Sequence, residues 1–134
     1  EQFGIGGLII FACPAYNLNK YHPSGRLYHP KENDGIGFIL EFNIHDGKDN
    51  ISIYFMGDTD FDPDEMSPAD VDILMIPVSG TYVMTADEAI VAINSIKPKI
   101  VIPMHYGSIV GSLDDAMKLK GNVEAQVEIL EEKS

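Results

Sequence analysis

The first apolar segment of the chain predicts a buried β-strand followed by a long loop. Residues 6–15 are rich in Ile and Phe and are bounded by glycines and by Pro14, a pattern that favours a strand over a helix of that length. Residues 16–34 contain Asn, Pro, Gly, Tyr and two histidines without a sustained period. A loop of this size in a compact domain is usually functional or mobile, so its polar residues are candidates for a site.

Two runs of β-branched and aromatic residues, 35–44 and 51–56, predict a β-hairpin. They flank the turn-forming sequence Asp-Gly-Lys-Asp-Asn at 46–50. His45 lies beside this turn and is expected to be a solvated hairpin residue. The next segment, 57–72, carries seven acidic residues and no basic one, which indicates a surface loop or a short helical turn.

The following segment predicts a strand, a helix and a second strand. Residues 71–78 are continuously apolar, and Thr85 with Glu88 forms a capping box that opens a helix ending before Pro98. Residues 99–103 form another short apolar run. The two strands of such a unit are parallel and are joined by a right-handed crossover.

The last part of the chain predicts a short helix and a final strand. Ser112 with Asp115 repeats the capping-box pattern, and the helix is expected to extend to about residue 120. Residues 123–130 then favour a strand. No repeat, low-complexity segment or linker divides the sequence, so residues 1–134 are expected to form a single α/β domain.

Composition and charge disfavour several classes of partner. With 45% apolar and 22% charged residues, the 134-residue chain has the composition of a globular domain. Its 21 acidic and 9 basic residues give a net charge of −12, which disfavours binding to nucleic acid or to an anionic membrane surface. A single cysteine, Cys13, excludes an intrachain disulfide. The lack of a disulfide fits a reducing, cytoplasmic environment. No apolar run approaches the ~20 residues that cross a bilayer, so a soluble chain is expected.

Three predicted strands are followed by unusual polar residues. Asp58 follows the run that ends at Met56, Ser79 follows the run 71–78, and His105 follows the run 99–103. Because ligands gather at the carboxyl ends of parallel strands, we expect Asp58, Ser79 and His105 to meet at one edge of the sheet. A carboxylate and an imidazole are common ligands of Zn, Mn and Fe. A turn-capping carboxylate and a half-buried histidine explain the same residues equally well.

Longer stretches of the sequence resemble a known family. Ile-Tyr-Phe-Met-Gly-Asp-Thr-Asp at 53–60 and Ile-Val-Ile-Pro-Met-His-Tyr-Gly at 100–107 resemble the C-terminal half of the metallo-β-lactamase superfamily, specifically its small cytoplasmic metal-dependent hydrolases. Cys-Pro-Ala-Tyr-Asn at 13–17, His-Pro-Lys at 29–31 and Ile-Pro-Val-Ser-Gly-Thr-Tyr at 76–82 are also similar to that branch and occur in the same order. The resemblance covers nearly the whole chain.

The resemblance implies half of an αββα sandwich, with a mixed β-sheet and covering helices. It also implies that Asp58 bridges two zinc ions and that His105 is the last histidine ligand of the second ion. In that family a metal-bound hydroxide attacks an ester, amide or phosphodiester, and the metal lowers the pKa of the water. Asp58 would be catalytic because it holds both ions and orients the hydroxide, and a small molecule would be the substrate.

The chain departs from the family pattern at the first metal site. That site depends on a His-x-His-x-Asp-His sequence, and the four histidines of this chain are not spaced in that way. The place after Pro14-Ala15, where the family commonly has a histidine, holds Tyr16 and then Asn17, which is a weak oxygen ligand at best. A catalytic zinc normally has three protein ligands and a water, so the chain alone is expected to bind zinc weakly and to be inactive or nearly so.

The remaining polar candidates have a structural explanation beside the functional one. His29 is either a substrate-facing residue or an ordinary turn residue, whereas His22 is expected to be the latter. Asp60 either supports the site or belongs to the acidic surface, and on an extended chain its side chain points the same way as that of Asp58. Tyr106 follows a strand end, where it either contacts substrate or packs.

Truncation is the simplest explanation of the missing ligands. The chain opens at Glu1 without an initiator Met, and we expect the histidine cluster to lie on an N-terminal half that precedes it. Removing that half uncovers an apolar sheet face, so the expected partner is a second copy or the missing N-terminal half. The alternative is a non-catalytic binding or assembly module that kept the fold and lost its metals.

Overall fold

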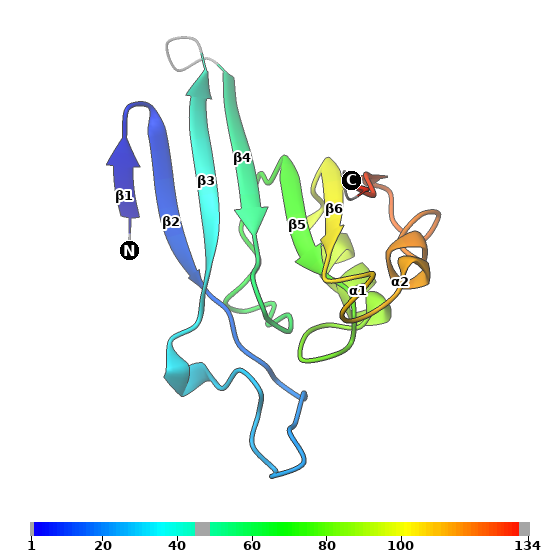
Figure 1. Cartoon of the computed structure of the whole chain (residues 1–134). Coiled ribbons are helices and arrows are strands. Elements are labelled where there is room, and N and C mark those ends of the chain that lie inside the picture. Colours follow the sequence, from blue (N-terminus) through cyan, green and yellow to red (C-terminus); the bar gives the residue numbers. More distant parts are fainter. Residues whose placement is uncertain (1, 45–48, 132–134) are drawn as a thin grey trace.

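Seven strands form one sheet in the computed structural model, which describes residues 2–44 and 49–131 (Figure 1). The strands lie side by side in the order in which they occur along the chain. Their bounds are β1 (Gln2–Ile5), β2 (Leu8–Pro14), β3 (Ile36–Ile44), β4 (Asp49–Phe55), β5 (Ile73–Pro77), β6 (Ile100–Met104) and β7 (Gln126–Val127). The helices of the described residues are α1 (Ala86–Ile96), α2 (Leu113–Met117) and a 3₁₀ helix at Lys31–Asn33.

The first four strands are antiparallel, and they confirm the predicted hairpin. β3 pairs with β4 along the whole length of β4. The tip of the hairpin, including His45, lies outside the described residues. β2 falls within the apolar segment 6–15, as predicted. The sequence analysis does not predict β1, which precedes the chain reversal at Gly6 and Gly7 and lies outside the predicted apolar segment.

The second half of the sheet is parallel and confirms the predicted strand–helix–strand unit. β5 pairs with both β4 and β6 in parallel register, and α1 connects β5 to β6. The capping box of α1 is formed as expected: Thr85 Oγ1 accepts from the backbone N–H of Glu88 (3.2 Å), and Glu88 Oε2 accepts from the N–H of Thr85 (2.7 Å). Neither α1 nor α2 has the length and apolar character needed to cross a membrane.

The predicted final strand at 123–130 is wrong for most of its length. Only Gln126 and Val127 pair with β6. Alternate apolar residues from Val123 to Ile129 pack against the core, which produces the period of a strand without its backbone pairing. α2 is also shorter than expected: it ends at Met117, and turns continue the chain to residue 122.

One face of the parallel strands carries the core of the molecule. Tyr54, Leu74 and Val101 are register partners on β4, β5 and β6, and all three are fully buried. Ala89 and Ile93 of α1 belong to the same buried cluster, so α1 covers this face of the sheet. Burial of this apolar surface is the main favourable term in folding.

The opposite face of the sheet is apolar and only partly covered. In Figure 1 α1 and α2 lie beside β5 and β6, and no helix lies over β1 to β3. The segment predicted as a buried strand is only half-buried in β2, over which no helix of the described residues lies. We call this surface the open face; its residues share one side of the sheet by register, and none of them is fully buried. They are Leu8, Ile10, Ala12, Phe38, Leu40, Phe42, Ile51, Ile53, Phe55, Ile73, Met75, Ile102 and Met104.

An ion pair between Asp72 and Lys99 lies at the amino ends of β5 and β6. Asp72 Oδ2 accepts from the backbone N–H of Ser52 (2.8 Å), and Oδ1 lies 2.5 Å from Lys99 Nζ. These contacts, chiefly the one with Lys99, hold the pKa of Asp72 below its ordinary value. A carboxyl whose pKa falls on folding stabilises the protein above its ordinary pKa, and that stabilisation is lost as the pH falls through the folded value.

We predict that Asp72→Asn lowers the free energy of unfolding by about 1 kcal/mol at pH 7, a value reduced from that of a buried charged hydrogen bond because the pair is partly solvated. The difference from the unmodified chain should shrink at pH 3. Urea unfolding at both pH values measures it, with the exposed Asp64→Asn as control. A difference that is equal at the two pH values would contradict the assigned role of the carboxylate.

Candidate metal site

Asp58 and His105 meet at the carboxyl edge of the parallel strands, as the sequence predicts. Asp58 follows β4 and His105 directly follows β6, while β5 lies between these two strands. His105 Nε2 lies 3.3 Å from Asp58 Oδ1. Two residues far apart in the sequence therefore place a carboxylate oxygen and an imidazole nitrogen in contact at one point.

His29 approaches the same carboxylate from the long loop. Its Nε2 lies 3.7 Å from Asp58 Oδ2, so the two imidazoles face different oxygens of one side chain. All three side chains are partly exposed, with 37%, 49% and 35% of their surface accessible for His29, Asp58 and His105. His29 and Asp58 also line a pocket of ≈ 330 Å³ whose apolar walls include Ile36 and Phe55. These three side chains, which we call the cluster, are therefore open to a small ligand.

The backbone at His105 is strained and closely packed. His105 has a φ of 56°, in the left-handed region that side chains other than glycine rarely occupy. Gly111 lies directly behind it with a φ of +65°, and a Cβ there would be 2.9 Å from His105 O and 2.8 Å from Ser79 Cβ. The absent side chain lets the 106–111 loop fold back against the strand ends and supports His105 in this conformation.

Ser79 and Tyr106 lie at the same strand ends, and their hydroxyls bond to nearby backbone. Ser79 Oγ donates to Thr81 O (3.1 Å) and accepts from the N–H of Thr81 (3.3 Å). Tyr106 OH donates to Leu130 O (2.6 Å), which ties the C-terminal segment to the end of β6. These contacts shape the loops around Asp58 and His105.

Asn17 is buried and connects three segments around the site. Its side chain oxygen accepts from the N–H of His29 (2.8 Å), its Nδ2 donates to Tyr82 O (2.8 Å), and its own backbone N–H donates to His29 O (2.7 Å). Only 2% of Asn17 is accessible. The structure thus places Asn17 behind His29, holding its backbone, and not on the open side of the cluster.

Asp60 is also buried, which corrects one expectation from the sequence. Its Oδ2 accepts from the N–H groups of Leu18 (2.7 Å) and Asn19 (3.2 Å), and its Oδ1 lies 3.0 Å from Lys20 Nζ. The prediction that Asp60 points the same way as Asp58 is wrong, because the chain bends at Asp58 and is not extended there: the Asp58 side chain is exposed and that of Asp60 is buried. Asp60 does not belong to the acidic surface either: it anchors the start of the long loop.

The sequence analysis misses two further residues that organise this region. Thr59 is fully buried between the two aspartates, and its Oγ1 accepts from the N–H of Tyr16 (2.9 Å). Tyr16 OH donates to Asp62 Oδ2 (2.7 Å) and Glu65 Oε2 (3.1 Å). The hydrogen bond from Tyr16 lowers the pKa of Asp62, and burial raises the pKa of Tyr16. No local sequence signal marks these partners, because each bond spans more than forty positions.

The donors of the cluster suit a metal ion but do not complete a site by themselves. One carboxylate and two imidazoles are of the type that binds zinc. Within residues 2–44 and 49–131, however, no three His, Cys, Asp or Glu side chains are grouped around one point so that they could hold an ion. A metal ion bound at Asp58 therefore needs more ligands than these described side chains provide around one point.

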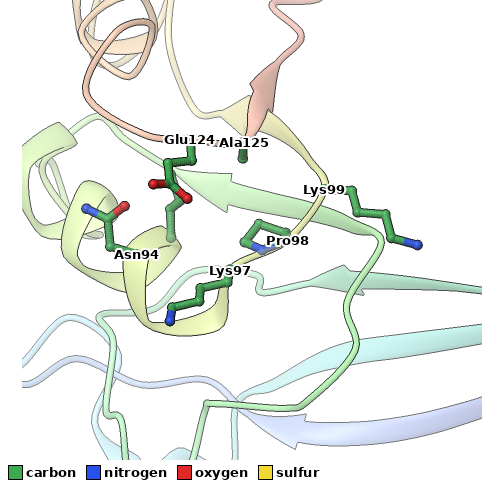
Figure 2. A pocket seen from close by; sticks show the side chains of 7 residues that line it. Asn94, Lys97, Pro98, Lys99, Glu124 and Ala125 are labelled. Carbon is green, nitrogen blue, oxygen red and sulfur yellow. The ribbon is translucent and has the colours of Figure 1, made fainter.

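A second pocket, of ≈ 490 Å³, lies at the opposite edge of the sheet. It is formed where α1 ends and β6 begins, and its polar lining consists of Asn94, Glu124, Lys97 and Lys99 (Figure 2). Lys99 points away from Asn94 and Glu124 in this view. The pocket contains neither Asp58 nor a histidine and is separate from the candidate metal site.

The sequence pattern of the beta-lactamase superfamily domain matches residues 2–105, from β1 to His105. The chain belongs to the metallo-β-lactamase superfamily. The fold agrees: a mixed sheet with helices is shared with solved structures of this superfamily. The family resemblance and the α/β fold class predicted from the sequence are both confirmed.

Relatives of this chain within the superfamily are named as metal-dependent hydrolases. The UPF0173 metal-dependent hydrolase of Methanocaldococcus jannaschii is 42% identical over 113 residues, which covers 81% of this chain and 48% of the relative. A provisionally assigned metal-dependent hydrolase from Parabacteroides distasonis has a TM-score of 0.72 at 34% identity, over 99% of this chain and 56% of that one. The fold is shared with a provisionally assigned Zn-dependent hydrolase from Thermotoga maritima. The TM-score is 0.69 at 20% identity, over 96% of this chain and 68% of that one.

This chain spans only part of the length of its relatives. It covers between 32% and 48% of the curated relatives from Polynucleobacter asymbioticus and Methanocaldococcus jannaschii. Those relatives thus contain a segment, of similar length or longer, that has no counterpart in this chain.

We predict that Gly111→Ala destabilises the chain by about 1–3 kcal/mol more than Gly121→Ala. Both glycines have positive φ, so both variants bear the same backbone penalty, but a Cβ at Gly121 meets no atom within 4 Å. Urea unfolding measures the difference, and the imidazole chemical shifts of His105 report displacement of the site. Equal destabilisation by the two variants would show that Gly111 does not support His105.

Proposed function

We propose that this chain contributes Asp58 and His105 to the metal centre of a metal-dependent hydrolase. The observation that carries the proposal is the 3.3 Å contact between His105 Nε2 and Asp58 Oδ1 at the carboxyl edge of the parallel strands. Two ligands each about 2 Å from a shared zinc ion lie about 3–4 Å from one another, so this separation suits a common ion. The names of the relatives support metal dependence, and zinc is the metal that a carboxylate with imidazoles suits best.

The residues of the chain have separable roles in this proposal. A bound zinc ion supplies a lowered pKa for water and polarises the bond to be cleaved. Asp58 presents both oxygens at the mouth of the pocket, where it holds the ligand geometry and is the catalytic residue of the chain. Ile36 and Phe55 give that pocket an apolar wall, which suits the hydrocarbon part of a small ester, amide or phosphodiester.

The site requires a second unit that supplies further ligands and covers the open face. The chain spans about a third to a half of the length of its curated relatives, and we assign it to the C-terminal half of an αββα sandwich. The open face needs apolar cover because exposed patches of more than a few hundred Å² promote association. In the complete hydrolase the N-terminal half provides that cover; in this chain by itself a second copy takes its place, across a two-fold axis.

We predict weak zinc binding that depends on Asp58 and His105. Asp58→Asn and His105→Ala should each weaken zinc binding by at least about tenfold, since each removes one of few ligands. Equilibrium dialysis with elemental analysis, at zinc concentrations up to millimolar, measures the affinity of this chain. Asp64→Asn, an exposed aspartate in the 57–72 loop, is the matched control and should bind as the unmodified chain does.

Two outcomes would overturn the zinc assignment. If Asp58→Asn binds zinc as well as the unmodified chain, the cluster is not the metal site. If the unmodified chain does not bind zinc at millimolar zinc concentration, the non-catalytic binding module is the better description of the chain.

We further predict that the isolated chain self-associates through the open face. Phe38 and Ile51 are both 37% exposed on that face, so Phe38→Glu combined with Ile51→Glu should reduce the mass measured by light scattering toward the 14.8 kDa of one chain. Val91, which is 65% exposed on α1, provides the control Val91→Glu with no expected effect. An unmodified chain that is a 14.8 kDa monomer and binds no hydrophobic dye would contradict the proposal.

A further inference from the structure

We propose that a pocket of the long loop, which we call the loop pocket, binds the carboxylate of a small organic acid through Arg26. The pocket has a volume of ≈ 640 Å³, and its lining includes Tyr21, Arg26, Tyr28 and Glu32. The described residues that line it include neither Asp58 nor a histidine. That the acid is a substrate of the chain rests on the proposed function, whereas its binding does not.

Arg26 is a cation without a carboxylate partner in an acidic chain. It is the only arginine of the sequence, whose net charge is −12. Within residues 2–44 and 49–131, no ion pair includes Arg26, although Glu32 lines the same pocket. Four lysines of the same part of the chain do pair with carboxylates: Lys20, Lys31, Lys99 and Lys118. The guanidinium of Arg26 thus keeps its charge and its N–H donors for a ligand.

The backbone of Arg26 is fixed by a tight turn that the local sequence encodes. The N–H of Gly25 donates to His22 O (2.8 Å), and Pro23 occupies the first central position of this turn, where its ring fixes φ. Gly25 then adopts a φ of 83°, which a residue with a side chain rarely does. The chain returns so that the N–H of His22 donates to Arg26 O (2.8 Å). Arg26 is therefore presented from an ordered position although it lies in a loop.

Two tyrosines give the loop pocket an aromatic wall. Tyr28 is half-buried, and its ring makes edge contacts with His22 (5.5 Å between ring centroids) and Tyr82 (4.5 Å), which hold it in place. Tyr21 forms an isolated antiparallel bridge with Leu27, and 59% of its surface is exposed. Accessible aromatic surface beside a cation suits the acyl or aryl part of a small organic anion.

The loop pocket adjoins the pocket at Asp58. Pro30 and Asn33 line both of them. Figure 1 shows the long loop beyond the end of the sheet at which β4 and β5 finish, the end at which Asp58 emerges. One extended ligand can therefore place its carboxylate at Arg26 and a cleavable ester or amide near Asp58.

The charges around the loop pocket favour a carboxylate over a phosphate. The planar guanidinium of an arginine donates two parallel N–H bonds to a carboxylate. Arg26 is the one cation among the described lining residues, and Glu32 contributes a negative charge, so the near −2 charge of a phosphate monoester is opposed more strongly than a monoanion. Glu32 and the side-chain oxygen of Asn33 can accept from an N–H or hydroxyl of the ligand. The ligand class is therefore a carboxylic acid that also carries an amide or ester, such as an N-acyl amino acid.

The test is an NMR titration of the chain without added metal, with hippurate (N-benzoylglycine) as the probe. We expect the Nε–H resonance of Arg26 and the ring resonances of Tyr21 and Tyr28 to shift, while those of the fully buried Tyr54 stay in place. The neutral hippuramide should bind at least about tenfold more weakly, because it lacks the charged hydrogen-bond acceptor. Equal affinity for the two probes would overturn the proposal. Tighter binding of phenyl phosphate than of hippurate would overturn its assignment to a carboxylate.

Variants give an independent measurement. Arg26→Gln should weaken hippurate binding at least about tenfold and abolish the preference for hippurate over hippuramide, whereas Arg26→Lys should restore only part of the affinity because an ammonium lacks the planar fork. Lys120→Gln removes one exposed charge outside the loop pocket and is the matched control, with no expected effect. Hippurate binding that is unchanged in Arg26→Gln would refute the role of Arg26.

Zinc dialysis separates this inference from the proposed function. An unmodified chain that binds zinc but not hippurate would overturn the inference alone. A chain that binds hippurate but not zinc would overturn the proposed function and leave the loop pocket as a carboxylate site.

Discussion

The parallel backbone pairing of β4, β5 and β6 is the constraint on which the candidate site depends. The pairing continues beyond the strands: Met56 N–H donates to Met75 O (3.1 Å), and Val78 N–H donates to Met104 O (3.2 Å). These bonds hold the carboxyl ends of three neighbouring strands at one level, so the residues that follow emerge at the same edge. Asp58 and His105 are neighbours for this reason. The packing of α1 on the core face of the sheet keeps the strands in place.

A buried polar network extends this rigid edge into the long loop. Asn17, Thr59 and Asp60 are almost inaccessible, and their side chains bond mainly to backbone groups. A buried carboxylate such as that of Asp60 is costly unless it is paired, and here two N–H groups and the ammonium of Lys20 compensate it. The network holds a loop that has little regular secondary structure, and it does so next to Asp58.

The open face and the incomplete donor set have one explanation in our proposal. Asp58 lines one pocket with Phe55 of the open face, and in our proposal a second unit completes both the face and the donor set. The partial coverage of the relatives is consistent with this explanation. A single missing half would supply the apolar cover and the absent ligands together, whereas loss of metals in a complete binding module would leave the apolar face unexplained.

The sequence by itself determined the local elements and one side of the site. The capping boxes at Thr85 and Ser112 act within one helical turn, and strand ends can be located from apolar runs, so the meeting of Asp58 with His105 followed from topology. Only the tertiary structure decided that Asp60 is buried, that residues 123–130 pair hardly at all, and that His29 approaches Asp58. These features depend on hydrogen bonds and packing between residues distant in the sequence, and no local pattern encodes such partners.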